Sequence, residues 1–221
     1  MLAKNPMFIM LSGLPCSGKS TWRAQMVSEL ERHNIPVTTL SADDIAWQMC
    51  VEHNQKNDPR EAKLTYTAMC TTYRARLEQQ YKSALLKTKN QPGGIVILDR
   101  TYLTSRWREA VLNVLASDAV SLVTFAVRDK VAWRKNLAQR NTQNPQKNIS
   151  PAVIASLTKG ATAPTIDEGF AAIISCRAIG EPCWEITFKQ AIDSLISTYM
   201  KSNLYPEPKT HCLMSTVDCS G

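Results

Sequence analysis

Short runs of apolar residues alternate along the chain with stretches in which apolar residues recur every three or four positions. The short runs are typical of strands buried in a parallel sheet, and the longer stretches are typical of helices with one apolar face. Strands are predicted at Met7–Ser12, Val37–Leu40, Ile95–Asp99, Ser121–Val127, Ala171–Cys176 and Trp184–Phe188. Helices are predicted at Lys19–His33, Pro59–Thr88, Ser105–Leu115 (with Ser105 as its N-cap), Val131–Arg140, from Pro151 onward and at Gln190–Lys201.

This alternation of strands and helices predicts an α/β protein with a three-layer fold. The sheet is expected to be mostly parallel, with helices on both of its faces. No linker interrupts the pattern before the C-terminus, so residues 1–203 are expected to form one domain. The polar segment Asn141–Ser150 is expected to be a mobile loop. Residues 204–221, which contain two prolines and little periodicity, are expected to be a flexible tail.

Composition narrows the classes of partner. The formal net charge is +7 and the pI is about 9.1, which favours a polyanionic partner such as nucleic acid. No stretch of about 18 apolar residues is present, so no membrane partner is expected. The seven cysteines include no Cys-x-x-Cys pair, which indicates free thiols and a cytoplasmic protein. The pattern does not indicate an oligomeric state.

The stretch Gly13-Leu-Pro-Cys-Ser-Gly-Lys-Ser20 has the spacing of a phosphate-binding P-loop and lies between a predicted strand and a predicted helix. Glycines allow backbone N–H groups to point at phosphate oxygens, and the helix N-terminus adds partial positive charge. Lys19 is expected to bind the β- and γ-phosphates of ATP, and the Ser20 hydroxyl is expected to bind Mg²⁺. The predicted ATP-binding residues are Gly13, Pro15, Cys16, Ser17, Gly18, Lys19, Ser20 and Thr21.

Carboxylates follow two of the predicted strands. Asp43 and Asp44 come just after the second strand, and Asp99 ends the third. Ligands of open parallel sheets bind at the carboxyl ends of the strands, so Asp43 is expected to act as the base that accepts a proton from an attacking hydroxyl. Asp44 is expected to cap the next helix or support the substrate. Asp99 is expected to bind the hydration shell of Mg²⁺ or the substrate, and Arg100 and Thr101 to contact substrate phosphates.

The segment at about 131–160 carries several basic residues. Arg134 and Arg140 lie on its predicted helix, and Lys147 lies in the polar segment that follows. Phosphoryl transfer needs positive charge over the migrating group, so this segment is interpreted as a helical lid whose catalytic cations are Arg140 and Arg134. The alternative interpretation is a solvated basic helix face. Residues 131–160 are called the lid segment below.

Several of these pieces, taken in order, resemble the kinase domain of the polynucleotide kinases that heal nucleic-acid ends in bacteriophages and mammals. The pieces are GLPCSGKSTW, SADD, VILDRT, AQRN and APTIDEGFAAI, and the resemblance covers roughly residues 7–175. The resemblance implies a P-loop kinase fold and transfer of the γ-phosphate of ATP, with Mg²⁺, to a 5′-hydroxyl of DNA or RNA. No phosphatase motif of the Asp-x-Asp-x-Thr type is present, so kinase activity alone is expected.

The departures from this family pattern concern the acceptor or the transition-state charge. Ser41 and Ala42 replace polar and basic residues that often precede the base, and Asn144 falls near the expected position of a second lid arginine. Ala46 stands where the phage enzymes have an arginine that contacts the acceptor phosphate, and Tyr102 stands where asparagine is usual. One alternative is therefore a kinase that phosphorylates a hydroxymethylpyrimidine base within DNA, with Trp47, Tyr66 and Tyr73 as candidate stacking residues. Further alternatives are a small-molecule kinase and a non-catalytic protein that switches with ATP.

Overall fold

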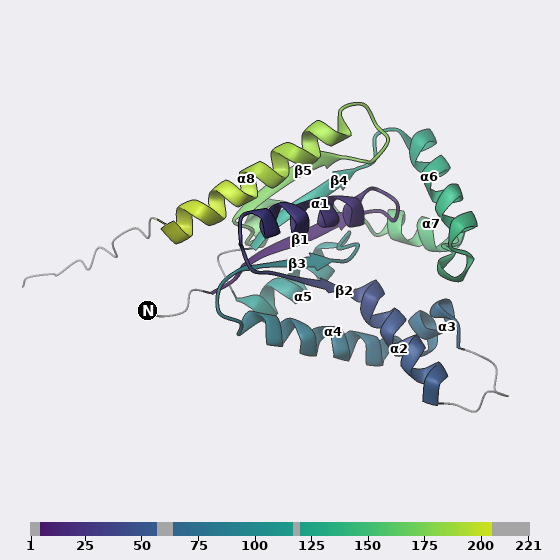
Figure 1. Ribbon diagram of the computed structural model, residues 1–221. Coiled ribbons are helices and arrows are strands. Elements are labelled where there is room, and N and C mark those ends of the chain that lie inside the picture. Colours follow the sequence, from purple (N-terminus) through teal and green to yellow (C-terminus); the bar gives the residue numbers. More distant parts are fainter. Residues whose placement is uncertain (1–4, 57–63, 117–119, 205–221) are drawn as a thin grey trace, which may run out of the picture.

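The computed structural model describes residues 5–56, 64–116 and 120–204. Five parallel strands form one sheet in the order β2-β3-β1-β4-β5 (Figure 1). Residue Leu11 pairs in register with Asp99, so the end of β3 lies beside the loop that follows β1. The strands are β1 Met7–Gly13, β2 Val37–Ser41, β3 Ile95–Asp99, β4 Val120–Ala126 and β5 Ala172–Arg177. The predicted α/β fold with a parallel sheet is confirmed.

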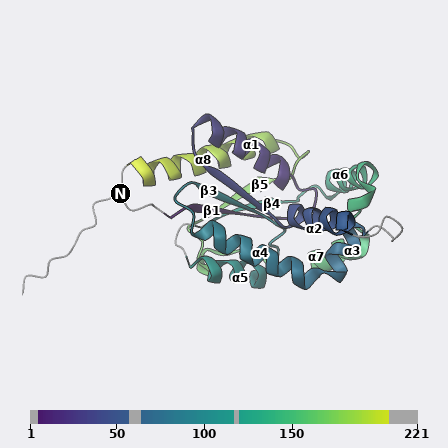
Figure 2. The ribbon, with the colours of Figure 1, turned by 60° about the horizontal axis from the view of Figure 1, so that its bottom comes forward.

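Helices cover both faces of this sheet. Figure 2 shows α1 and α8 on one face and α4 and α5 on the other. The first face buries Trp22 and Phe188, and the second buries Tyr81 and Leu115. The helices are α1 Lys19–Arg32, α2 Ala42–Lys56, α3 Tyr66–Thr72, α4 Arg74–Lys89, α5 Ser105–Leu115, α6 Lys130–Gln143, α7 Pro151–Lys159 and α8 Trp184–Leu204, with short 3-10 turns η1 Pro145–Lys147 and η2 Ile166–Glu168.

A smaller apolar cluster joins α2, α3 and α4 away from the sheet. Ala46 and Met49 of α2 pack against Met69 of α3 and Leu77 of α4. The Asn54 side chain exchanges two hydrogen bonds with the backbone of Leu64, at 2.8 and 3.0 Å. These contacts fix α3 beside α2, although the residues between them, 57–63, are not described.

Two predicted elements are wrong. The single helix expected from Pro59 to Thr88 is broken at Tyr73 into α3 and α4, and residues 59–63 lie outside the described part of the chain. The strand expected at Trp184–Phe188 is the first turn of α8. Helical spacing places Trp184 and Phe188 on one face, where their rings pack edge to face at 5.0 Å between centroids. This packing overrides the strand preference of the aromatic and β-branched residues.

Smaller differences concern element ends. No bounds were predicted for the helix after the second strand, and α2 begins directly after β2. Thr104, not Ser105, is the N-cap of α5, because its hydroxyl accepts from the Trp107 N–H. Part of the segment expected to be a loop is helical, because α6 continues to Gln143 and η1 follows it. The Ser150 hydroxyl caps α7 as the Ser-Pro pair indicated. Apart from Leu204, the predicted tail lies outside the described residues.

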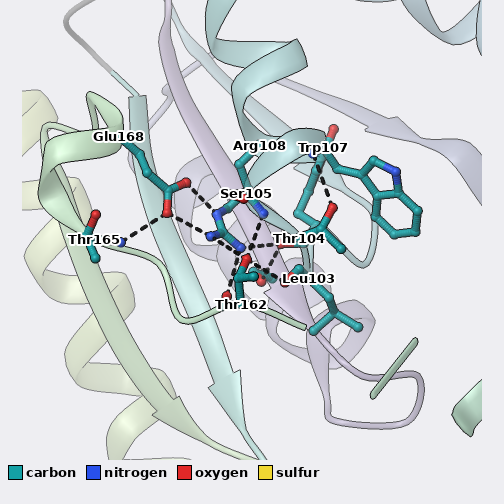
Figure 3. A network of polar contacts seen from close by, with 10 residues as sticks. Leu103, Thr104, Ser105, Trp107, Arg108, Thr162, Thr165 and Glu168 are labelled. Atoms are coloured by element: carbon teal, nitrogen blue, oxygen red, sulfur yellow. Dashed lines mark hydrogen bonds and ion pairs between the residues drawn. The ribbon is translucent and has the colours of Figure 1, made fainter. Parts of the chain in front are cut away.

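A buried ion pair connects α5 to the chain that follows the lid segment (Figure 3). The Arg108 guanidinium has no exposed surface and donates two hydrogen bonds of 2.7 Å to the Glu168 carboxylate. It also donates to the Thr162 carbonyl and hydroxyl at 3.2 Å. Glu168 in turn accepts from the Thr165 N–H at 3.2 Å. This network holds the chain just after the lid segment against α5, and it gives Thr165 and Glu168 of the Pro-Thr-x-x-Glu-Gly-Phe pattern a structural role.

We expect Glu168→Ala to lower the free energy of unfolding by about 3 kcal/mol, because it leaves the Arg108 charge buried without its partner. Chemical denaturation measures this loss. The control is Asp193→Ala, which removes an exposed pair with Lys189 and is expected to cost about 0.5 kcal/mol or less. Equal losses in the two variants would contradict the prediction.

The same pair gives the stability a pH dependence. Hydrogen bonds from Arg108 lower the pKa of Glu168 below its ordinary value of about 4.5. A lowered folded-state pKa stabilises the protein fully above the ordinary value, and this stabilisation is lost as pH falls through the lowered value. We therefore expect the difference between Glu168→Ala and the wild type to shrink in acid below pH 4.5.

Candidate active site

The loop between β1 and α1 has the backbone that a phosphate needs. Gly18 has a φ of 104° and is the N-cap of α1, with no side chain satisfying the first N–H groups of the helix. A Cβ at Gly18 would lie 2.8 Å from the Phe188 ring, so packing against α8 requires glycine here. The buried Ser17 hydroxyl has no hydrogen-bond partner among the described residues. The loop therefore presents unsatisfied donors at a helix N-terminus, as an anion site does.

Lys19 lies over this loop. Its Nζ donates to the carbonyl oxygens of Gly13 at 2.8 Å and Leu14 at 2.9 Å. Burial lowers the pKa of Lys19, and the Asp99 and Asp43 carboxylates oppose this shift. A buried ammonium with depressed pKa is stabilised by an arriving anion. Lys19 thus fits the predicted role of a phosphate ligand.

Asp99 lies at the end of β3, where it faces the first turn of α1. Its Oδ2 is 3.5 Å from the Ser20 hydroxyl, which donates to it, and 3.1 Å from Nη1 of Arg23. Burial raises the pKa of Asp99, while Lys19 and Arg23 oppose the shift. Arg23 also pairs with Asp44 at 3.3 Å. Arg23 was not predicted as a site residue, and its position one turn after Ser20 is the signal that would have indicated it.

The Ser20 hydroxyl and the Asp99 carboxylate fit a Mg²⁺ site that is completed by the nucleotide. Both are oxygen ligands, and they already lie within 3.5 Å of each other. No cluster of three or more His, Cys, Asp or Glu side chains suited to a metal occurs in residues 5–56, 64–116 and 120–204. Mg²⁺ usually keeps several waters and binds through one or two carboxylates together with substrate phosphates. When bound, the ion would neutralise charge on the phosphates.

Asp43 lies on the first turn of α2, across from the loop. Its Oδ1 accepts a hydrogen bond of 2.8 Å from the Tyr66 hydroxyl of α3. The neighbouring Asp44 is not the cap of α2, because the Ser41 hydroxyl accepts from the Asp44 N–H at 3.1 Å. The Asp44 carboxylate pairs with Arg23 instead. Its predicted capping role is therefore wrong, and its predicted role in supporting the substrate stays a prediction.

The phosphate-binding loop, Asp43 and the lid segment line one cavity of about 850 Å³. In Figure 1 the lid helices α6 and α7 lie on one side of the strand ends, and α2 and α3 lie on the other. The cavity brings together eleven predicted site residues: Pro15, Cys16, Gly18, Lys19, Ser20, Thr21, Asp43, Asp99, Arg100, Thr101 and Arg140. Gly13 and Ser17 are buried within the loop, and Asp44 and Arg134 do not line the cavity.

Hydrogen bonds attach the start of the lid segment to the site. Nε1 of Trp133 donates to the Pro15 carbonyl at 2.7 Å, and the Asn136 amide donates to the Ile179 carbonyl at 2.9 Å. On the same helix, Arg140 faces the cavity near Cys16 and Lys19, while Arg134 is exposed. Further along, the Lys147 ammonium lies over the rings of Trp47 at 5.3 Å and Tyr66 at 5.2 Å.

Arg100, which was predicted to contact phosphates, already has a partner. Its guanidinium forms a two-point ion pair with the Glu78 carboxylate, one bond of which measures 2.8 Å. It also lies over the rings of Tyr81 and Trp107, at 5.5 and 5.7 Å. An acceptor phosphate would have to compete with Glu78, so a phosphate contact by Arg100 stays a prediction. Glu78 lies 22 residues before Arg100, and no local pattern indicated this pair.

The fold and the phosphate-binding loop define a nucleotide-binding domain of the P-loop, kinase-like class. Residues 8–164 match the protein family described as an AAA domain, and the chain belongs to this family of P-loop NTPases. A search of curated proteins found no match. None of the described helices is long and apolar enough to cross a lipid bilayer.

Solved structures share the fold over most of their length. Kti12 from Chaetomium thermophilum, in complex with ADP-AlF3, has a TM-score of 0.57 at 16% identity, over 86% of this chain and 97% of that one. A gluconokinase from Sinorhizobium meliloti 1021 has a TM-score of 0.56 at 11% identity, over 91% and 98%. A fungal RNA kinase has a TM-score of 0.51 at 14% identity, over 94% and 91%. At these identities the likeness shows the fold alone.

We expect Trp133→Phe to weaken ATP binding about 3-fold, because it removes the N–H that connects the lid segment to Pro15 but keeps an aromatic ring. Titration calorimetry with ATP measures the change. The control, Trp47→Phe, alters an indole that does not line the cavity and should leave ATP affinity unchanged. Unchanged affinity in Trp133→Phe would show that this contact does not support the loop.

Proposed function

We propose that this protein is an ATP-dependent kinase that transfers the γ-phosphate to a hydroxyl of a nucleic acid, and that its acceptor is a 5′-hydroxyl end of DNA or RNA. The observation that carries the proposal is the position of Asp43. Its carboxylate lines the same cavity as Lys19 and accepts a hydrogen bond from the Tyr66 hydroxyl. An ATP switch needs a residue that positions water, whereas a kinase needs an acceptor base at this place.

The proposed reaction uses Lys19, Asp43 and Arg140 in separate roles. Lys19 and the loop N–H groups bind the phosphates of ATP, and Asp43 accepts the proton of the attacking hydroxyl. The hydroxyl oxygen bonds to the γ-phosphorus, the bond from that phosphorus to the β–γ bridging oxygen breaks, and ADP leaves. Arg140 reaches the cavity from the lid segment and stabilises the negative charge on the transferred group. Arg134 is given no catalytic part here, because it lies outside the cavity.

The acceptor side of the cavity suits a polyanion. Arg74 of α4 is exposed and lines the cavity, and the whole chain carries a net charge of +7. The fold similarity to a fungal RNA kinase supports the same class of acceptor. A gluconokinase, which is named for a small acceptor, has a similar fold. The fold alone therefore does not identify the acceptor, which is assigned from the site.

Two of the departures from the polynucleotide kinase pattern, at Ala46 and Tyr102, are buried side chains. Ala46 is 1% exposed inside the α2–α3–α4 cluster. Tyr102 is also 1% exposed, and its hydroxyl bonds that of Tyr81 in the core. A second acceptor, a hydroxymethylpyrimidine base within DNA, is favoured by the Tyr66 ring, which lines the cavity beside Asp43. Trp47 and Tyr73 do not line that cavity.

Label transfer from γ-labelled ATP tests the function. The acceptors are 5′-hydroxyl DNA, 5′-hydroxyl RNA, 5′-phosphorylated duplex containing hydroxymethyluracil, and gluconate. We expect label on 5′-hydroxyl ends and at least a 100-fold loss in Asp43→Asn, with ATP affinity retained, because only the proton acceptor is removed. Asp44→Asn is the control and should lose far less, since Asp44 lies outside the cavity.

The other possible results of this assay would indicate a different acceptor or a different function. Label on the blocked duplex alone would move the acceptor to the modified base. Label on gluconate alone would make the protein a small-molecule kinase. ATP hydrolysis without label on any acceptor, unchanged in Asp43→Asn, would contradict kinase function and favour a switch.

Two arginines of α6, Arg140 and Arg134, allow the assignment of the lid cation to be tested. We expect Arg140→Ala to reduce kcat about 100-fold, because the transferred group loses a positive charge. Arg134→Ala removes the same charge from the exposed face of α6 and should leave kcat within about 2-fold of wild type, since exposed charges far from the chemistry act weakly. Steady-state kinetics at saturating ATP and acceptor measure both, and equal losses would contradict the assignment.

A further inference from the structure

The contacts around Asp43 indicate a role for Tyr66 that the proposed function does not include. Tyr66 begins α3 and is 23 residues from Asp43 in the sequence, and its hydroxyl donates to Asp43 Oδ1 at 2.8 Å. Burial, together with the neighbouring Asp43 carboxylate, raises the pKa of Tyr66 well above that of free tyrosine. The phenol therefore stays protonated and remains a donor. With Oδ1 occupied, Oδ2 is the oxygen that is left to face an acceptor hydroxyl.

The same tyrosine ring also contacts the lid segment. The Lys147 ammonium of η1 lies 5.2 Å from the Tyr66 ring centroid and 5.3 Å from that of Trp47. Lys147 thus attaches the lid segment to α2 and α3, on the side of the cavity opposite the loop. A cation over the face of a phenol draws electron density from the ring, which makes the hydroxyl a stronger donor. Lys147, Tyr66 and Asp43 form a continuous series of contacts.

We propose that Tyr66 is a positioning residue that orients the Asp43 carboxylate and connects that orientation to the docking of the lid segment through Lys147. This inference rests on the proposed function. It differs from a purely structural role for Tyr66, because it assigns the effect to the hydroxyl and not to the packing of the ring. The firm attachment of α3 to α2 by Asn54 and the apolar cluster keeps the ring in place when the hydroxyl is removed.

Steady-state kinetics of Tyr66→Phe test the first part of the proposal, that the Tyr66 hydroxyl orients the Asp43 carboxylate. We expect kcat to fall about 10-fold, as loss of a hydrogen bond to a charged group predicts, while KM for ATP stays the same. The matched control is Tyr73→Phe, which removes a hydroxyl at the junction of α3 and α4 from a ring that packs at a tilt against His53. Its kcat should equal that of the wild type. In the Asp43→Asn background, Tyr66→Phe should have no further effect on kcat.

A double-mutant cycle with Lys147→Met tests the second part of the proposal, that Lys147 connects this orientation to the docking of the lid segment. Alone, Lys147→Met should reduce kcat about 3-fold, in line with loss of a cation–π contact. Combined with Tyr66→Phe it should add nothing, because its influence passes through the hydroxyl. A Lys147 effect that persists in the Tyr66→Phe background, or that appears only as a higher KM for the acceptor, would overturn the connection to the lid segment.

Different results would overturn the role of Tyr66 and the proposed function. A wild-type protein that is active, with Tyr66→Phe equal to it in kcat, would overturn the role of Tyr66 and leave the proposed function standing. A wild-type protein that transfers phosphate to none of the acceptors would overturn the proposed function, and the role of Tyr66 with it.

Discussion

The site depends on the pairing of β1 with β3 in a parallel sheet. Because Leu11 lies opposite Asp99, the carboxylate at the end of β3 reaches the first turn of α1 just after the phosphate-binding loop. The loop itself keeps its shape because Gly18 packs against Phe188 of α8, where no side chain fits. Anion-binding N–H groups, the Lys19 ammonium and the Ser20–Asp99 oxygens therefore converge at this end of the sheet. The remainder of the site is placed around this centre.

Two further bodies of structure complete the cavity. On one side, the α2–α3–α4 cluster carries Asp43 and Tyr66 to the end of β2. On the other, the lid segment is attached at both ends, by Trp133 to Pro15 and by the Arg108–Glu168 network to α5. Between these attachments, Arg140 lines the cavity and Lys147 lies over the rings of Tyr66 and Trp47. Such an arrangement suits a segment that closes over a nucleotide.

Features encoded in local sequence were predictable. The phosphate-binding loop, its strand and helix and the carboxylates at strand ends follow from short patterns, and the structure places them as expected. Pairs that join distant parts of the chain were not predictable. Tyr66 with Asp43, Arg100 with Glu78 and Arg108 with Glu168 are separated by 23, 22 and 60 residues. No periodicity indicates which of many polar residues will meet. Trp184–Phe188 shows the converse error, since packing between its own aromatic rings favours a helix where composition favoured a strand.

The central claim is that Asp43 and the phosphate-binding loop act on one ATP molecule and one acceptor hydroxyl within a single cavity. A crystal structure with a non-hydrolysable ATP analogue, Mg²⁺ and a 5′-hydroxyl oligonucleotide tests it most directly. The account predicts that the 5′-oxygen lies within hydrogen-bond distance of the Asp43 carboxylate, about 2.6–3.2 Å, and in line with the γ-phosphorus. An acceptor end bound outside the cavity, or a γ-phosphate that points away from Asp43, would contradict it.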